Sequence, residues 1–170
     1  MENVVLIGMP ASGKSTMGGR LARLTGWRFL DVDREIERRC GMPLSRIIET
    51  RGDNGFRQVE NEVNATLDVD HTVIAPGGSV IYGEEAMAHL REIAKVVYLK
   101  LSYEHIEERL GDLHARGITF RPGQTLRDLY NERVPLYEKY AHIVLECDGR
   151  LLYDLAEELR LRLGIPLLEA

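Results

Sequence analysis

The strongest constraint on this chain is a short segment, Gly8-Met9-Pro10-Ala11-Ser12-Gly13-Lys14-Ser15, which fits the pattern G-x-x-x-x-G-K-S. It directly follows the apolar run Val4-Val5-Leu6-Ile7 and precedes residues that suit a helix. A strand that leads through a glycine-bounded turn into a helix is the setting in which this pattern forms a phosphate-binding loop. The alternative, a glycine-rich turn with an incidental lysine, requires a chance match that average residue usage makes rare.

The residue types of this loop suit a polyphosphate. Gly8 and Gly13 leave the backbone free of side chains, so that successive N–H groups can point at phosphate oxygens near the positive end of a helix dipole. Lys14 is expected to reach the β- and γ-phosphates, and the Ser15 hydroxyl to bind Mg²⁺. The sequence therefore predicts that the chain binds a nucleoside triphosphate.

The size and charge of the chain limit the classes of protein to which it can belong. A chain of 170 residues suits one domain, and its net charge of −5 argues against a general affinity for nucleic acid. Cys40 and Cys147 lack metal-ligand spacing, which favours reduced thiols in the cytoplasm. The first residues lead straight into a strand, and no apolar run approaches the roughly 20 residues that a membrane span needs. We expect a cytoplasmic monomer, with a dimer left open, and no nucleic-acid or membrane partner.

Strand and helix patterns alternate along the whole chain. We expect strands over 4–7, 27–31, 71–75, 96–99 and 143–145, and helices over 17–24, 34–39, 44–50, 59–67, 84–93, 103–110, 126–140 and 151–163. Residues 52–55 are expected to break a helix, and Pro135 to mark a kink or a helix boundary. Residues 111–124, with three glycines and a proline, are the best candidate for a loop.

Apolar strands between amphipathic helices predict an α/β fold with a mostly parallel sheet that is covered on both faces. Ligands of such folds bind beyond the carboxyl ends of the strands. The phosphate-binding loop, Asp31-Val32-Asp33 and Pro76-Gly77-Gly78 all follow predicted strands. We therefore expect these motifs to meet at one edge of the sheet.

The two aspartates can serve phosphoryl transfer. One carboxylate can hold Mg²⁺ and the other can orient an attacking hydroxyl or accept its proton. For Asp33 a helix N-cap is the structural alternative. Gly77 and Gly78 allow the backbone to approach a ligand closely, although a plain turn would also explain them.

The motifs taken together resemble those of the shikimate kinase family. The match extends from the first strand to about residue 145 and rests on residues 8–16, Asp31-Val32-Asp33, Gly55-Phe56-Arg57 with Glu60, Pro76-Gly77-Gly78, Arg121-Pro122 and Arg133-Val134-Pro135-Leu136-Tyr137. The resemblance implies a P-loop NTPase of the nucleoside-monophosphate-kinase-like fold, with a five-stranded parallel sheet in the order 2-3-1-4-5. It also implies transfer of the γ-phosphoryl group of ATP to the 3-hydroxyl of shikimate, a step of aromatic amino acid biosynthesis.

Site roles follow from the same resemblance. It assigns ATP to Gly8, Pro10, Ala11, Ser12, Gly13, Lys14, Ser15, Thr16, Arg116 and Arg121, and Mg²⁺ to Ser15 and Asp31. It assigns the substrate to Asp33, Arg57, Gly77, Gly78 and Arg133, with catalytic roles for Lys14, Asp33 and Arg121. Arg57 and Arg133 would bind the substrate carboxylate through forked hydrogen bonds, with Glu60 one helical turn from Arg57 to hold its guanidinium. Arg121 would lie in a lid formed by about 111–124. From residue type alone, an arginine on a helix is more often simply solvated.

The chain departs from the family pattern on the acceptor side. Ser79 replaces the third consecutive glycine, and Gly52-Asp53-Asn54-Gly55 replaces the usual Gly-Glu before Phe56. Arg121-Pro122-Gly123 also lacks the leucines that usually follow Arg-Pro. Two alternatives therefore stay open: a kinase for another small polyhydroxy acid such as a sugar acid, and an ATP-binding switch with little catalytic activity.

Overall fold

A computed structural model describes residues 2–111 and 121–169. The sheet contains the parallel strands β1 (Asn3–Ile7), β2 (Arg28–Asp31), β3 (Thr72–Ala75), β4 (Lys95–Lys100) and β5 (Ile143–Glu146). Their order is β2-β3-β1-β4-β5, which confirms the predicted topology.

The central position of β1 decides where the site lies. Val4 and Val5 pair with Val73 and Ile74 of β3 on one side, while β4 pairs with β1 on the other. All five residues of β1 are buried, as a central strand covered on both faces requires. The edge strands β2 and β5 are partly exposed instead. The loop that follows β1 therefore emerges in the middle of the carboxyl edge.

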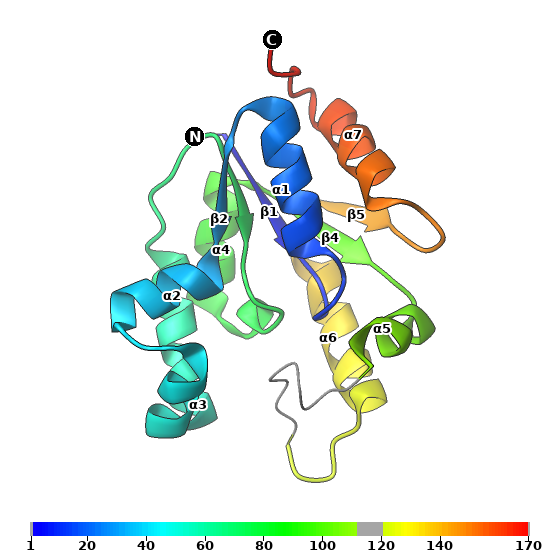
Figure 1. Ribbon diagram of the computed structural model, residues 1–170. Helices are drawn as coiled ribbons and strands as arrows, with labels where there is room; N and C mark the ends of the chain where they lie inside the picture. The colour runs from blue at the N-terminus through cyan, green and yellow to red at the C-terminus, as the bar shows by residue number, and fades with distance from the viewer. Residues whose placement is uncertain (1, 112–120, 170) are drawn as a thin grey trace.

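Helices cover both faces of the sheet. They are α1 (Lys14–Thr25), α2 (Val32–Cys40), α3 (Leu44–Ala65), α4 (Glu84–Ile93), α5 (Tyr103–Leu110), α6 (Leu126–Tyr140) and α7 (Leu152–Leu163), with a 3₁₀ turn η1 (Val80–Tyr82). Helices α1 and α7 pack together on one face, and α4 and α6 lie behind the sheet (Figure 1). Helices α2 and α3 project beside the carboxyl edge.

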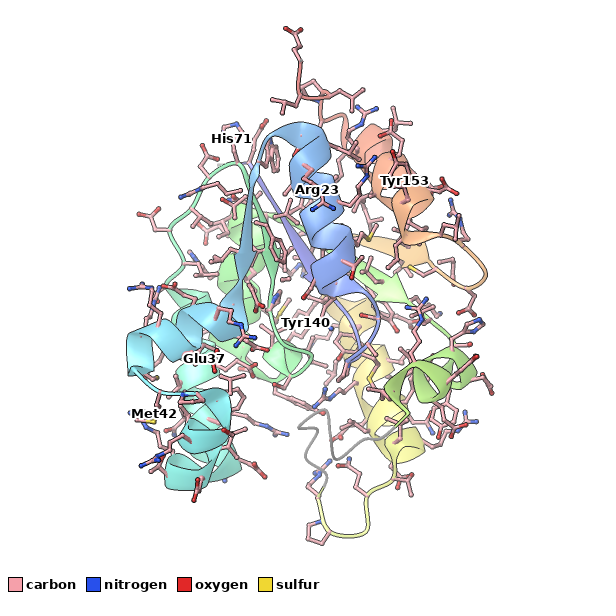
Figure 2. All side chains as sticks on the ribbon, in the orientation of Figure 1. Arg23, Glu37, Met42, His71, Tyr140 and Tyr153 are labelled. Carbon is pink, nitrogen blue, oxygen red and sulfur yellow. The ribbon has the colours of Figure 1, made fainter. Side chains whose placement is uncertain are left out.

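The turn between α2 and α3 is fixed by one side chain of α2. A Glu37 carboxylate oxygen accepts a hydrogen bond of 3.1 Å from the Leu44 N–H, which satisfies one free donor at the start of α3. Figure 2 shows Glu37 near this turn, which carries Met42. The hydrogen bond anchors α3, the helix that carries Arg57 and Glu60 to the site.

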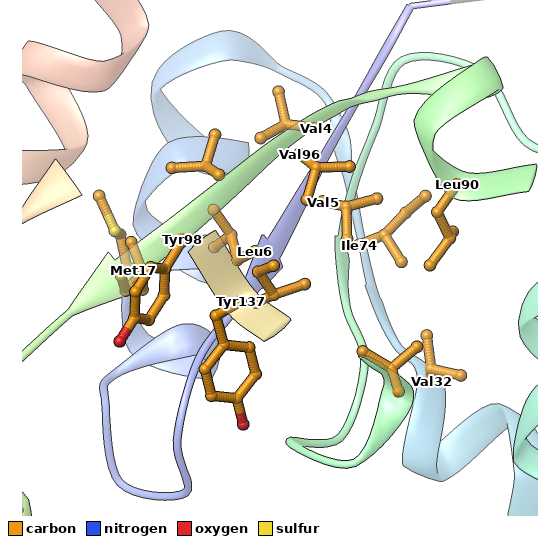
Figure 3. Packing of buried hydrophobic residues seen from close by; sticks show 14 of the residues in the cluster. Val4, Val5, Leu6, Met17, Val32, Ile74, Leu90, Val96, Tyr98 and Tyr137 are labelled. Atoms are coloured by element: carbon orange, nitrogen blue, oxygen red, sulfur yellow. The ribbon is translucent and has the colours of Figure 1, made fainter. Parts of the chain in front are cut away.

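The hydrophobic core contains side chains of the central strands and of the helices on both faces of the sheet. Met17 of α1 and Leu6 of β1 are fully buried, and the ring of Tyr98 on β4 stacks on that of Tyr137 on α6 at 5.1 Å (Figure 3). This stacking fixes the position of α6 against the sheet. Among the described residues, no helix combines the length and apolar character that crossing a membrane requires.

Two local predictions need correction, and a third is confirmed in part. The predicted break lies at Gly52, with φ 71° and ψ 177°, where two helical segments of α3 meet at a kink, but residues 53–55 are helical. The helix expected to include Leu67 ends at Ala65, because the N–H and hydroxyl of Thr66 donate back to the Val63 and Glu62 carbonyls.

Pro135 does not end its helix. Helix α6 runs through it to Tyr140. Pro135 is exposed, so water can reach the carbonyl that loses its usual N–H partner there. The packing of Tyr137 on Tyr98 holds the following turn in place.

Candidate functional site

A pocket of about 330 Å³ lies at the carboxyl edge of the sheet. The phosphate-binding loop, the end of β2, α3, the loop after β3 and α6 all contribute to its wall. The predicted site residues among its lining are Pro10, Lys14, Ser15, Asp31, Asp33, Arg57, Gly77, Gly78, Arg121 and Arg133. The structure therefore brings together motifs from most of the chain.

The loop after β1 adopts a tight conformation that its residue types permit. Gly13 has φ 97° and Ala11 has φ 64°, both in the left-handed region. A Cβ atom on Gly8 would lie 2.9 Å from the Ser12 Oγ, so a larger residue would displace that side chain. Gly13 is the N-cap of α1, and the exposed Ser15 and Thr16 lie in the first turn, where N–H groups have no partner within the helix. This geometry suits a phosphate chain.

Lys14 lies against the loop itself. Its Nζ donates hydrogen bonds to the carbonyls of Gly8 at 2.8 Å and Met9 at 2.9 Å. Burial and the nearby charge of Arg133 lower the pKa of Lys14 to about 8, although Asp33 opposes the change. An anion bound at the loop would favour the charged form of this lysine.

Asp31, and not Asp33, caps the start of α2. Asp31 is the N-cap of α2, because its Oδ1 accepts a hydrogen bond of 3.0 Å from the Asp33 N–H. Asp33 lies in the first turn of α2 and lines the pocket, so the N-cap interpretation of Asp33 is wrong. Burial, together with the Asp31 charge, raises the pKa of Asp33, which makes it a better proton acceptor.

Gly77 and Gly78 lie in tight surroundings, where a side chain would force its neighbours to move. A Cβ atom on Gly77 would lie 3.1 Å from carboxylate oxygens of both Asp33 and Glu60. On Gly78 it would lie 3.0 Å from the Arg133 Nη1 and 3.3 Å from the Gly8 carbonyl oxygen. Any larger residue would press on the charged groups that surround the pocket.

The two arginines come from α3 and α6 and line the pocket together with residues of the phosphate-binding loop. Arg57 is exposed on α3, while Arg133 on α6 is 8% exposed. Burial disfavours the charge of Arg133, yet the phenol groups of Tyr137 and Tyr82 keep its pKa above the ordinary value. The Arg133 Nε is buried and has no hydrogen-bond partner among the described residues.

Glu60 does not hold Arg57 as expected. Its Oε1 accepts a hydrogen bond of 2.7 Å from the Ser79 hydroxyl, and no Arg57–Glu60 ion pair lies within 4 Å. Glu60 is 3% exposed. Burial raises its pKa to about 7, the nearby Asp33 contributes, and the Ser79 hydrogen bond opposes the shift. The serine that departs from the family pattern therefore anchors this carboxyl group.

Arg121 is held by α6. Its Nη2 lies 2.5 Å from a Glu132 carboxylate oxygen, and the Gln124 amide donates to the other oxygen at 3.1 Å. Partial burial works against the Glu132 charge, but Arg121 outweighs it and lowers the pKa of Glu132. Arg116 and most of the predicted lid, 112–120, lie outside the described residues.

Sequence reasoning missed four contributors. Arg109 on α5 donates to the Ala11 carbonyl at 3.3 Å, and Tyr82, Ser79 and Glu132 contact the charged groups described above. No sequence pattern indicates a role for Arg109, because only the fold brings α5 next to the phosphate-binding loop. Ser79 was visible as a departure from the family pattern, but its partner was not.

Metal-binding chemistry is limited to oxygen donors at this pocket. No cluster of three or more histidine, cysteine or carboxylate side chains that can hold a metal ion occurs within residues 2–111 and 121–169. The Ser15 hydroxyl and the Asp31 carboxylate both line the pocket beside Lys14. Such donors suit Mg²⁺ when phosphate oxygens and water complete its shell. Cys40 and Cys147 are free thiols.

Comparisons with known proteins all point to one family. A family model described as shikimate kinase matches residues 10–163. A shikimate kinase of Pseudomonas paraeruginosa is 38% identical over 167 residues, which cover 94% of this chain and 97% of the relative. The structure of a shikimate kinase from Acinetobacter baumannii in complex with shikimate has a TM-score of 0.85 and 37% identity, covering 95% of this chain and 93% of the other. For shikimate kinase from Aquifex aeolicus the TM-score is 0.82 at 32% identity, covering 95% and 96%.

Proposed function

This chain belongs to the shikimate kinase family, and we propose that it transfers the γ-phosphoryl group of ATP to the 3-hydroxyl of shikimate. One observation carries the choice of acceptor. Arg57 and Arg133 line the same pocket as Lys14 and Asp33, so that cations for a carboxylate, a carboxylate for a hydroxyl and the phosphate-binding lysine face one cavity. An acceptor with a carboxylate at one end and hydroxyls at the other fits this arrangement of charges.

ATP would bind with its phosphates along the loop of residues 8–15. The N–H groups at the start of α1 would receive phosphate oxygens, and Lys14 would exchange its contacts with the loop carbonyls for contacts with the β- and γ-phosphates. Mg²⁺ would be held by Ser15 and Asp31 and would neutralise charge on the phosphates. Arg121 would leave Glu132 to contact the transferred group.

The acceptor would be oriented by groups that the fold holds in place. Its carboxylate would receive hydrogen bonds from Arg57 and Arg133, which both line the pocket. Its hydroxyls would contact Asp33 and the backbone of Gly77 and Gly78. The raised pKa of Asp33 suits it to accept the hydroxyl proton as the oxygen attacks phosphorus.

A panel of acceptors tests the proposal. We would measure ADP release with shikimate, with gluconate and without acceptor, at matched concentrations of MgATP. We expect turnover that depends on shikimate. Release stimulated only by gluconate would favour a sugar-acid kinase, and tight ATP binding without turnover on any acceptor would favour an ATP-binding switch.

Two variants test the ATP-binding side and the acceptor-binding side of the site separately. Lys14→Met should abolish turnover, because the phosphates lose their main cation. Arg57→Ala should raise the KM for shikimate by about tenfold and leave the KM for ATP unchanged, since charge-assisted hydrogen bonds are worth about 1.5–3 kcal/mol. Arg51→Ala is the matched control, because Arg51 is exposed on the same helix and does not line the pocket. An unchanged KM for shikimate in Arg57→Ala would contradict the assignment.

A further inference from the structure

The two arginines of the acceptor side share one aromatic contact. The Arg57 Cζ lies 4.3 Å from the centroid of the Tyr82 ring, and the Arg133 Cζ lies 5.6 Å from the same centroid. Both distances fall within the range of about 6 Å over which a guanidinium is attracted to an aromatic face. Arg57 comes from α3 and Arg133 from α6, so the ring of η1 links two helices that are far apart in sequence.

Few other contacts hold these arginines. Neither Arg57 nor Arg133 makes an ion pair within the described parts of the chain, and the other groups that act on the Arg133 charge are the phenols of Tyr137 and Tyr82. Two guanidinium groups that converge on one pocket also repel each other, most strongly where one of them is buried. The electron-rich face of Tyr82 attracts both cations and offsets part of this repulsion.

The ring itself is held by its neighbours. Val80 and Ile81, which precede Tyr82 in η1, are 1% and 2% exposed. The Tyr82 N–H donates to the Ser79 carbonyl at 3.1 Å. The segment that places Gly77 and Gly78 in the pocket therefore also fixes the position of the ring.

Contact with the ring leaves the arginines free to bind a ligand. A guanidinium is attracted to a ring through its flat face, whereas its hydrogen bonds lie in its own plane. A carboxylate can thus approach the N–H groups of Arg57 while the arginine stays on the ring. Pre-ordering of this kind reduces the conformational entropy that binding must remove.

From these contacts we propose that Tyr82 is a positioning residue, whose ring places Arg57 and Arg133 to receive the carboxylate of the acceptor. The inference rests on the proposed function. It concerns the ring, which lies within cation–π distance of both guanidinium groups, and a variant that keeps the ring but lacks the hydroxyl separates the two parts of the side chain.

Steady-state kinetics of three variants tests the proposal. Tyr82→Leu removes the ring and should raise the KM for shikimate by about tenfold, while kcat and the KM for ATP stay within about twofold. Tyr82→Phe keeps the ring and should stay within about twofold of wild type in all three constants. Tyr153→Leu is the control, because Tyr153 also lies under an arginine, Arg20 at 3.7 Å, but on α7 away from the pocket (Figure 2).

A double-mutant cycle excludes a general loosening of the fold. Because Arg57 and Tyr82 would act together, Tyr82→Leu should raise the KM for shikimate by a smaller factor in an Arg57→Ala background than in wild type. Tyr82→Met provides the same comparison if the leucine variant does not fold.

The outcomes separate the two proposals. If wild type turns over shikimate and Tyr82→Leu keeps the wild-type KM, or if Tyr82→Phe loses as much as Tyr82→Leu, the role of the ring is refuted. The role of the ring is also refuted if Tyr82→Leu raises the KM for shikimate by the same factor in the Arg57→Ala background as in wild type. If wild type does not phosphorylate shikimate at all, the proposed function fails instead.

Discussion

Glu60→Gln should change how the stability of this protein depends on pH. Burial raises the Glu60 pKa from 4.5 to about 7, and Asp33 adds to the effect against the opposing Ser79 hydrogen bond and Arg133. Glutamine keeps the shape of a neutral glutamic acid and an oxygen that can accept from Ser79, but it does not ionise. The substitution therefore removes one titration and little else.

The size of the effect follows from linkage. Because the folded-state pKa of Glu60 is raised, the stability associated with its neutral form is present below pH about 4.5 and is lost as pH rises through about 7. At 1.36 kcal/mol per pKa unit, the full loss is about 3 kcal/mol, of which roughly 2 to 3 kcal/mol falls between pH 5 and pH 8. Relative to that of wild type, the free energy of unfolding of Glu60→Gln should therefore increase by roughly 2 to 3 kcal/mol between pH 5 and pH 8.

Urea unfolding at pH 5 and pH 8 measures the difference directly. Wild type and Glu60→Gln are compared at both values, with Glu62→Gln as the control, since Glu62 is exposed on the same helix. If the free energy of unfolding of Glu60→Gln differs from that of wild type by the same amount at both pH values, the buried titration of Glu60 is refuted. A gain by Glu62→Gln of equal size would refute its assignment to Glu60.

Three further substitutions have defined outcomes. Gly78→Ala places a Cβ atom 3.0 Å from the Arg133 Nη1, so the KM for shikimate should rise by about tenfold, as 1–3 kcal/mol of overpacking would produce; an unchanged KM would contradict this. Met17→Ala empties a fully buried position and should lower the free energy of unfolding by about 2–5 kcal/mol in urea, and a loss below about 1 kcal/mol would show that the core closes around it. Glu132→Gln releases Arg121 and should lower the KM for ATP by up to about fivefold; a higher KM would mean that the ion pair aids nucleotide binding.

The sequence alone predicted the features that repeat along the chain or follow a local rule. The period of apolar residues indicated every strand, and the glycine-bounded motif indicated the loop after β1, because both depend on neighbouring residues. Local rules also explain the errors. A proline disfavours helix from residue type, yet Pro135 is tolerated because solvent reaches its turn, and Gly52 interrupts α3 without ending it.

Contacts between distant segments came only from the tertiary structure. The partner of Ser79 is Glu60, nineteen positions earlier in the chain, and the ring of Tyr82 meets arginines of α3 and α6. No sequence pattern encodes such a pairing, because it depends on how helices pack on the sheet and which rotamers that packing allows. The sequence predicted a polyphosphate-binding loop after the first strand. Packing decided which charges face it and how burial changes their pKa values.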